Sequence, residues 1–317
     1  MTDLGNKIGI LKDAFMGNLM KVKVLYDLRL RKALTLSSRQ DTSVIVSLTT
    51  YGKRVNGSVV YTVYSLLRQS VRPERVVLWL DEKEYNDRNL PKALRFLCDY
   101  GLDVRYGKDI RAYTKFIHSL SAFPDKHIIT ADDDLYYTNT FVEEFVEAHR
   151  LHPKAIITGY AKMPLADNDC QLAPYGTWPE YHHVKDSFQY DSYKLFPLGW
   201  GGVLYPSHVF DDEVKNEAVF TTLCPKADDI WLYVMGLRCQ AEKRMLTNSH
   251  IAYYHTDLLR QYLTRDRLTA TNRFGGENDT QLQALLAHYD IRVRIKIITT
   301  SSYERKIYLW RVYPTVY

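Results

Sequence analysis

The sequence contains few cysteines and no long apolar run. Its four cysteines show no CxxC spacing, which excludes a zinc knuckle and a disulfide scaffold and favours a reducing compartment. No stretch approaches the ~18 apolar residues of a membrane span, and the first residues lack the uninterrupted apolar segment of a signal peptide. Repeats and low-complexity tracts are also absent. With 46% apolar and 25% charged residues in 317, the composition predicts one main globular domain in the cytoplasm, with terminal appendages.

The net charge of +5 is distributed unevenly along the chain. Residues 1–40 and residues 291–317 each carry a net charge of +5, which leaves residues 41–290 at −5. Proteins that bind nucleic acid usually carry their positive charge on the globular domain itself. The acidic body therefore argues against a nucleic-acid partner.

Both basic ends interleave their charge with apolar or aromatic residues. Basic side chains attract anionic headgroups, and Tyr and Trp favour the interfacial layer of a bilayer. One prediction is therefore a peripheral enzyme on the inner face of the cytoplasmic membrane, with an anionic membrane surface as a partner. The alternative is a plain cytosolic enzyme, in which the first segment packs as a helix and the tail adds an edge strand. The residues concerned are Ile8, Leu11, Phe15, Leu19 and Val22 among lysines, and Tyr303, Tyr308, Trp310, Tyr313 and Tyr317 among Arg305, Lys306 and Arg311.

The first 150 residues alternate between strand and helix patterns. β-branched runs of strand length alternate with stretches whose apolar residues recur at helical spacing. A strand, a helix and a second strand in succession make the two strands parallel neighbours. The fold class is therefore α/β, with a mainly parallel central sheet flanked by helices. Strands are predicted at 44–50, 75–80, 102–106, 126–130, 155–159, 201–205 and 250–255, and helices at 58–67, 90–99, 111–122, from 141, from 228 and at 277–289, with a long loop at 160–198.

Three consecutive aspartates, Asp132, Asp133 and Asp134, follow the strand predicted at 126–130. Ligands of open α/β sheets bind at the carboxyl ends of the strands. Adjacent carboxylates repel one another, so a cation is expected among them, and Mg²⁺ or Mn²⁺ prefers carboxylate oxygens together with substrate phosphates. The alternative is a solvated acidic turn before the next helix.

An ordered set of motifs between residues 43 and 256 carries a family resemblance: VIVSLTTYGKR, RVVLWL, IITADDD, GWGG and ADDIW. With these motifs the sequence resembles nucleotide-sugar-dependent glycosyltransferases of the GT-A fold, and is similar to the bacterial family-two-like enzymes of surface polysaccharide synthesis. The resemblance implies a GT-A catalytic domain over 41–290, in which 41–150 binds the nucleotide sugar and 151–290 the acceptor. It implies metal-dependent transfer of a sugar, from a UDP-sugar donor by preference, to a hydroxyl of a glycan or lipid-linked glycan.

The resemblance also assigns the family's DXD carboxylates. Asp134 is the first choice of ligand for Mn²⁺ or Mg²⁺, and Asp132 is assigned to the sugar side and as a second ligand, with Asp133 between them. His255 is a further candidate ligand, although a histidine near a strand end is often structural. The other donor-binding candidates are Thr49, Thr50, Tyr51 and Arg54 for the nucleobase, Asp81 for the base or ribose, and Asp109 and Lys115 ahead of the triplet, with Lys115 neutralising the diphosphate.

The second half supplies acceptor-side candidates. Trp200, Gly201 and Gly202 belong to GWGG, where the tryptophan suits an apolar platform under a sugar and the glycines allow close approach or positive φ. Asp228 and Asp229 open a predicted helix, and the resemblance implies a base that takes the proton of the acceptor hydroxyl. Asp229 is preferred over Asp228, although aspartates also favour first helical turns as caps. A base favours inversion; a retaining enzyme could carry the same pair.

Two other functions compete with sugar transfer. A nucleotidyltransferase acting on sugar phosphates would share the sheet and the acidic site, but it should show a glycine-rich phosphate loop, and TTYGKR has one glycine. A non-catalytic carbohydrate-binding protein could use the tyrosine-rich loop, but it has no reason to place three carboxylates at a strand end. Metal-dependent hydrolysis of the donor separates the enzyme from the binding protein.

Overall fold

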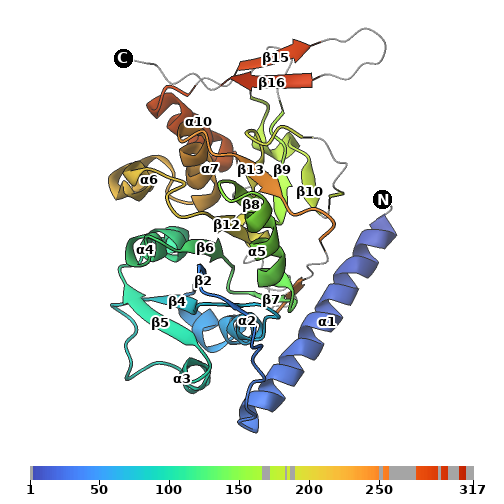
Figure 1. The fold of residues 1–317 in the computed structure, drawn as a ribbon, viewed down its shortest axis with the longest axis vertical. Coiled ribbons are helices and arrows are strands. Elements are labelled where there is room, and N and C mark those ends of the chain that lie inside the picture. Colours follow the sequence, from blue (N-terminus) through green and yellow to red (C-terminus); the bar gives the residue numbers. More distant parts are fainter. Residues whose placement is uncertain are drawn as a thin grey trace. The chain divides into compact units, whose positions relative to one another are not determined.

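The computed structural model describes residues 3–165, 172–182, 184–185, 190–249, 253–256, 276–291, 294–298 and 307–311. Figure 1 labels its elements. The helices are α1 (Asp3–Arg29), α2 (Ser58–Leu67), α3 (Lys92–Cys98), α4 (Thr114–Ala122), α5 (Phe141–Leu151), α6 (Glu217–Leu223), α7 (Asp228–Arg238) and α10 (Glu277–His288). The strands are β1 (Gln40–Asp41), β2 (Val44–Thr49), β3 (Arg72–Pro73), β4 (Val76–Asp81), β5 (Leu102–Gly107), β6 (His127–Thr130), β7 (Leu135–Tyr137), β8 (Ile156–Thr158), β9 (Tyr160–Lys162), β10 (Glu180–His182), β11 (Phe196–Pro197), β12 (Val203–Tyr205), β13 (Lys243–Met245), β14 (Tyr253–His255), β15 (Arg294–Ile298) and β16 (Ile307–Arg311).

The central sheet has seven strands in the order β13-β8-β12-β6-β2-β4-β5. β2 pairs in parallel with both β4 and β6, β4 pairs in parallel with β5, and β8 pairs in parallel with β13. β12 is antiparallel to β8. The prediction of an α/β protein with a mainly parallel sheet flanked by helices is therefore confirmed, including the parallel pairing of the first two predicted strands.

The chain divides into two compact units. Unit 1 comprises residues 1–151 and 249–267, and unit 2 comprises residues 152–248 and 268–317. The strands β6, β2, β4 and β5 belong to unit 1, and β12, β8 and β13 belong to unit 2. In the described part of the chain, no helix combines the length and apolar character that crossing a membrane requires.

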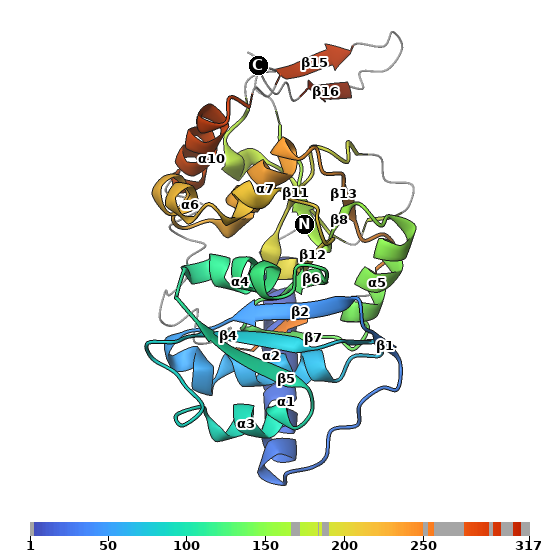
Figure 2. The ribbon, with the colours of Figure 1, turned by 60° about the vertical axis from the view of Figure 1, so that its left-hand side comes forward.

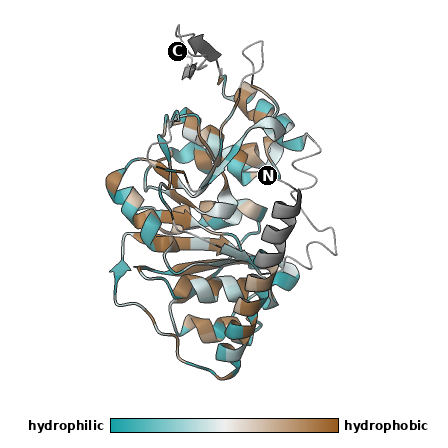
Figure 3. Ribbon diagram, turned by 90° about the vertical axis from the view of Figure 1, so that its right-hand side faces the viewer, coloured by the Kyte–Doolittle hydropathy of each residue, from teal (hydrophilic) through white to brown (hydrophobic). Residues whose placement is uncertain are grey.

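In unit 1 the parallel strands lie between two layers of helices. Figures 1 and 2 show α4 on one face of these strands and α2 with α3 on the other. α2 buries Val59, Val63 and Leu66 completely, at the spacing of one helical face. Figure 3 shows the corresponding alternation of apolar and polar residues along the covering helices. Burial on both faces explains why β2 and β4 are continuous apolar runs.

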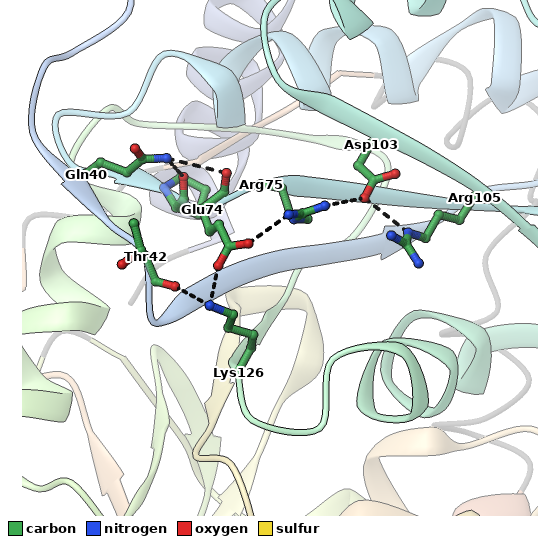
Figure 4. Close-up of polar contacts among 8 residues, drawn as sticks. Gln40, Thr42, Glu74, Arg75, Asp103, Arg105 and Lys126 are labelled. Carbon is green, nitrogen blue, oxygen red and sulfur yellow. Dashed lines mark hydrogen bonds and ion pairs between the residues drawn. The ribbon is translucent and has the colours of Figure 1, made fainter.

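At the amino ends of the unit 1 strands, the charges form a structural network (Figure 4). Lys126, just before β6, pairs with Glu74 and donates to the Thr42 carbonyl oxygen at 2.8 Å. Arg75 lies 2.8 Å from Glu74 and 3.2 Å from Asp103 on β5. Each of these charged side chains has a protein partner of opposite sign, so ion pairs neutralise this edge of the sheet.

Unit 2 corrects the prediction that residues 160–198 form one long loop. β9, β10 and β11 lie in that segment and form an antiparallel sheet of order β10-β9-β11. These strands are only two or three residues long, too short to give a period-2 pattern in the sequence. α7 packs against β11 and α10. At the C-terminus, β15 and β16 pair with each other in a separate two-stranded sheet, and the tail residues Tyr303, Tyr313 and Tyr317 lie outside the described residues.

Candidate functional site

The carboxyl ends of β2 and β6 lie next to each other in unit 1. Ser47 of β2 is in register with Thr130 of β6, and the Ala131 N–H donates to the Ser47 carbonyl oxygen at 3.0 Å. Thr50 directly follows β2, and the aspartate triplet follows β6 one residue later. Parallel pairing therefore brings the polar residues after both strands to the same edge of the sheet, as expected for a ligand site of this fold class.

The middle carboxylate of the triplet, Asp133, is buried. It accepts a hydrogen bond from Thr50 Oγ1 on Oδ2 (2.5 Å) and one from Arg54 Nη1 on Oδ1 (2.6 Å). Burial raises the pKa of Asp133, and the charge of Arg54 and the hydrogen bond from Thr50 oppose that rise. Although burial lowers it, the nearby Asp133 and Asp134 charges raise the pKa of the Arg54 guanidinium overall, so Arg54 stays charged. Asp133 thus ties the segment after β2 to the turn after β6.

The first carboxylate of the triplet, Asp132, pairs with a lysine of α4. Lys115 Nζ lies 2.9 Å from Asp132 Oδ1. Ser47 Oγ donates to the Lys115 carbonyl oxygen at 2.5 Å, which fixes this turn of α4 above β2. The Asp132 N–H donates to the hydroxyl oxygen of the buried Tyr137 at 2.9 Å. Lys115 and Asp132 are therefore held in place by backbone contacts as well as by their ion pair.

The last carboxylate of the triplet, Asp134, also faces a cation. Arg54 Nη1 lies 3.6 Å from Asp134 Oδ2. The Asp134 carbonyl oxygen accepts two hydrogen bonds from Thr256, one from its N–H and one from Oγ1, both at 2.9 Å. The side chains of Asp132 and Asp134 are 33% and 18% exposed, against 7% for Asp133. The two outer carboxylates are thus the accessible ones.

These two carboxylates fit the needs of a hard divalent cation. Mg²⁺ is usually held by one or two carboxylates together with waters and substrate phosphates, so a complete protein cage is not required. In the described part of the chain, no group of three or more His, Cys, Asp or Glu side chains could enclose an ion. Asp132 and Asp134 are the residues that would hold a cation, and Lys115 and Arg54 are the cations it would compete with.

His255, the other candidate ligand, contacts α1. Its N–H donates to Asp13 Oδ1 at 3.1 Å, and its Nε2 lies 3.9 Å from Asp13 Oδ2. Its strand, β14, pairs with β7, which directly follows the triplet. The contact with Asp13 suits the structural alternative for His255, because it ties β14 to α1.

The candidates for nucleotide binding divide into two groups. Tyr51 is 60% exposed, and the Arg54 guanidinium carbon lies 5.5 Å from the centroid of its ring, so this ring remains open to a planar ligand. Thr49 Oγ1 instead donates to the Trp79 carbonyl oxygen of β4 at 3.1 Å. Asp81 and Asp109 accept hydrogen bonds from the N–H two residues ahead, at 3.0 and 2.7 Å, and so stabilise turns.

In unit 2, each glycine of GWGG meets a different steric requirement. The Gly199 N–H donates to both carboxylate oxygens of Asp229 at 3.2 Å, and a Cβ on Gly199 would lie 2.5 Å from Asp229 Oδ1. A Cβ on Gly201 would lie 2.2 Å from the ring of Tyr160. Gly202 has φ of +85°, a conformation that glycine adopts at little cost. The motif therefore places backbone directly against Asp229 and Tyr160.

Trp200 belongs to an aromatic group built around Tyr160. The Trp200 and Tyr160 ring centroids are 4.2 Å apart, and Tyr160 stacks on His182 at 5.4 Å with the ring planes 19° apart. Trp200 is half-buried and His182 is exposed, so the group reaches the surface of unit 2. Aromatic faces of this kind suit the apolar face of a sugar ring.

Asp228 and Asp229 occupy the first turn of α7. The residue before the helix is Ala227, whose side chain provides no cap. Both aspartates are half-buried, and Asp229 is bound to the Gly199 N–H. The structure therefore joins the predicted base to the GWGG motif within unit 2.

Three residues that contact these candidates were missed by the sequence analysis. Tyr137 and Thr256 hold the backbone of Asp132 and Asp134, and Tyr160 supports Trp200. Tyr137 has a signal in the sequence, because a tyrosine so close to an acidic run can reach its backbone. Thr256 and Tyr160 have none, since only the fold brings them to their partners.

No family model matches the sequence, and no curated protein matches it significantly.

Proposed function

We propose that the protein is a metal-dependent glycosyltransferase of the GT-A type, which moves a sugar from a nucleotide diphosphate sugar to a hydroxyl of a glycan or lipid-linked glycan. One observation carries the proposal: two accessible carboxylates, Asp132 and Asp134, follow the carboxyl end of the parallel strand β6, each beside a protein cation. A diphosphate with a divalent cation has the complementary charge pattern, because its phosphates suit Lys115 and Arg54 and its cation suits the carboxylates.

On the donor side, the residues of unit 1 bind the nucleotide sugar and orient it. The exposed Tyr51 ring is assigned to stack on the nucleobase. Lys115 exchanges Asp132 for the oxygens of the diphosphate, and Arg54 gives up only its longer contact with Asp134 to bind them. Asp133 keeps its bonds to Thr50 and Arg54, so the base of the site stays rigid while the outer charges change partners. A divalent cation held by Asp132 and Asp134 would stabilise the charge of the departing diphosphate as a Lewis acid.

On the acceptor side, the proposal assigns a proton transfer to unit 2. The acceptor oxygen attacks the anomeric carbon, the bond from that carbon to the diphosphate oxygen breaks, and the acceptor's proton passes to the carboxylate of Asp229. The Gly199 N–H holds this carboxylate in one orientation. Transfer assisted by such a base inverts the anomeric centre.

The direct test is a panel of nucleotide sugars with UDP-sugars first. Purified protein is incubated with each donor and Mn²⁺ or Mg²⁺, and ¹H NMR follows release of the nucleotide diphosphate and the configuration of the sugar product. We expect slow hydrolysis of one donor that stops on addition of EDTA and resumes with excess metal. The proposal is contradicted if the nucleotide diphosphate is released at the same rate with and without EDTA. It is also contradicted if no donor binds and none is hydrolysed.

Carbohydrate binding without catalysis is the second candidate, and the stack of Trp200, Tyr160 and His182 favours it. It predicts glycan binding that is lost in Trp200→Leu, with no donor turned over under any condition. The same panel therefore separates the two functions.

A further inference from the structure

Helix α1 is attached to unit 1 along one face. The Asp13 carboxylate accepts from the His255 N–H, Val24 is fully buried, and Asp27 accepts from the Tyr64 hydroxyl at 2.6 Å. Gly17 allows the helix to approach β14, because a Cβ there would lie 2.2 Å from the His255 carbonyl oxygen. These positions recur at helical spacing, so the side chains between them face away from the unit. Figure 1 shows α1 as the long blue helix.

The outward face of α1 is apolar and exposed. Phe15, Leu19, Val22 and Tyr26 are spaced by four, three and four residues, and their exposures are 68%, 49%, 65% and 56%. This spacing places them on one stripe of the helix, opposite the attached face. Single exposed apolar residues are common on proteins, but a continuous stripe of four large ones marks a surface that a partner covers.

The charges of α1 are sorted between its two faces. Its described acidic residues, Asp13 and Asp27, both lie on the attached face and have partners in the protein. The exposed charged residues beside the stripe, Lys23 and Arg29, are basic. A second copy of α1 would bring like charges together, whereas an anionic surface complements both the stripe and its flanks.

A cavity of about 780 Å³ adjoins the C-terminal end of the stripe, within unit 1. α1, α2 and α3 line it, with apolar walls that include Leu25 and Phe96. Four basic residues and one acidic residue face it: Arg29, Arg31, Lys92, Arg95 and Asp99. Apolar walls with an excess of positive charge suit an anionic headgroup and the first part of its acyl chains.

We infer that the outward face of α1 and the adjoining cavity bind the surface of a bilayer that contains anionic phospholipid. The stripe of Phe15, Leu19, Val22 and Tyr26 enters the headgroup layer, and the basic residues contact lipid phosphates. The helix lies in the plane of the interface, with its attached face on unit 1 and its exposed stripe in the lipid. This binding needs no nucleotide sugar, so it stands or falls separately from the proposed activity.

The test is vesicle co-sedimentation of the full chain, with no donor or acceptor present. Vesicles of phosphatidylcholine alone are compared with vesicles holding 30% phosphatidylglycerol (~0.3 mole fraction, an anionic surface), in low and high salt. We expect binding to the anionic vesicles that weakens with salt. The double variant F15S/V22S removes the two most exposed members of the stripe, and K23E/R29E reverses its flanking charge; each should lower the partition coefficient by roughly tenfold or more.

Matched control variants distinguish vesicle binding through the stripe from non-specific binding of exposed apolar or basic residues. L151S/Y193S removes two exposed apolar residues elsewhere, and K83E/R88E changes the net charge by the same amount on other loops; both should bind like the wild type. Lys92→Glu tests the cavity: an acidic residue suits the start of α3, so the fold persists while lipid binding weakens. Thermal unfolding midpoints confirm that each variant is folded.

Three outcomes overturn the inference. The first is wild-type protein that stays in the supernatant with every vesicle. The second is equal loss of binding in the stripe variants and their matched controls. The third is wild-type protein that sediments as a dimer without lipid and becomes monomeric in F15S/V22S, which would make the stripe a contact between two copies.

Discussion

Lys115 Nζ lies 2.9 Å from Asp132 Oδ1, so the acidic triplet carries a protein cation of its own. Arg54 does the same for Asp133 and Asp134. Charge repulsion within the triplet alone therefore does not require a metal ion, and the case for one depends on the exposure of Asp132 and Asp134. Under the proposed function, the two cations are poised to move to the diphosphate when the donor and metal arrive together.

Lys115→Met should separate metal binding from donor binding. Without the ammonium group, Asp132 no longer has a competitor for a cation, so the affinity for Mn²⁺ without donor should rise several-fold, as measured by titration with EPR detection. Donor affinity should fall, because the diphosphate loses a positive partner. Lys126→Met, from the network of Figure 4, is the matched control and should change neither. If the Mn²⁺ affinity of Lys115→Met is unchanged, Lys115 does not compete with a metal ion for Asp132.

The three aspartates of the triplet should differ in what their loss disrupts. Asp134→Asn and Asp132→Asn should abolish donor turnover and leave the thermal unfolding midpoint largely intact, because both side chains are partly exposed. Asp133→Asn should cost about 2 kcal/mol in the free energy of unfolding, since the half-buried Arg54 and the buried Thr50 lose their charged acceptor. Urea unfolding and the donor assay measure the two effects. Full activity of Asp134→Asn would remove it from the site.

Asp103→Asn is the control for this series, because Asp103 pairs with Arg75 and Arg105 at the opposite ends of the strands. It should leave donor turnover unchanged.

Asp229→Asn should lower kcat on the order of 10²–10⁴-fold with little change in donor affinity, as expected for loss of a general base. Gly199→Ala should have a similar effect with Asp229 intact, because its Cβ would displace the carboxylate from a position 2.5 Å away. Gly236→Ala is the matched control, because Gly236 lies on α7, the helix that carries Asp229. If Asp228→Asn gives the larger loss of kcat, the base is Asp228; if donor binding collapses in Asp229→Asn, that residue belongs to the donor site.

Lys243 should make stability depend on pH in the alkaline range. Its ammonium nitrogen is buried and donates to the Tyr193 and Ala241 carbonyl oxygens, and burial lowers its pKa to about 7. The ordinary lysine pKa is near 10.5, so between pH 7 and that value the unfolded chain binds more protons than the folded one. Stability from this group therefore rises with pH across this window, by up to about 1.4 kcal/mol per pH unit.

Lys243→Met should remove this slope, measured as urea unfolding free energy at several pH values from 7 to 10. His288→Gln, at the exposed end of α10, serves as the control. An unchanged slope in Lys243→Met would show that another group titrates.

Much of unit 1 was determined by local sequence. β2 and β4 are apolar runs of strand length, α2 and α4 repeat apolar residues at helical spacing, and the turn residues lie between them. Because strands joined by one helix become parallel neighbours, the order of elements also predicted that β2 pairs with β4, whereas the position of β6 beside β2 came from the structure. The candidate residues were therefore found where local pattern and topology agree.

The tertiary structure determines which aspartates of the triplet are buried and which are exposed. The sequence shows three identical carboxylates, and only the packing of β6 beside β2 buries Asp133 and leaves Asp132 and Asp134 partly exposed. The same holds for Tyr160 and Thr256, whose partners are distant in the chain. The strands within 160–198 were not predicted, because strands of two or three residues are too short to show a pattern in the sequence and form through pairing with other strands.

Residues 1–40 show the same distinction. Their sequence established a basic segment with apolar residues at helical spacing, which allowed either a packed helix or a membrane-binding one. In the structure, the face of α1 that carries Gly17 and Val24 packs against unit 1. The opposite face, with Phe15 and Val22, is exposed to solvent. Periodicity in a sequence specifies which residues share a face, but only the neighbours that pack against a helix determine which of its faces is buried.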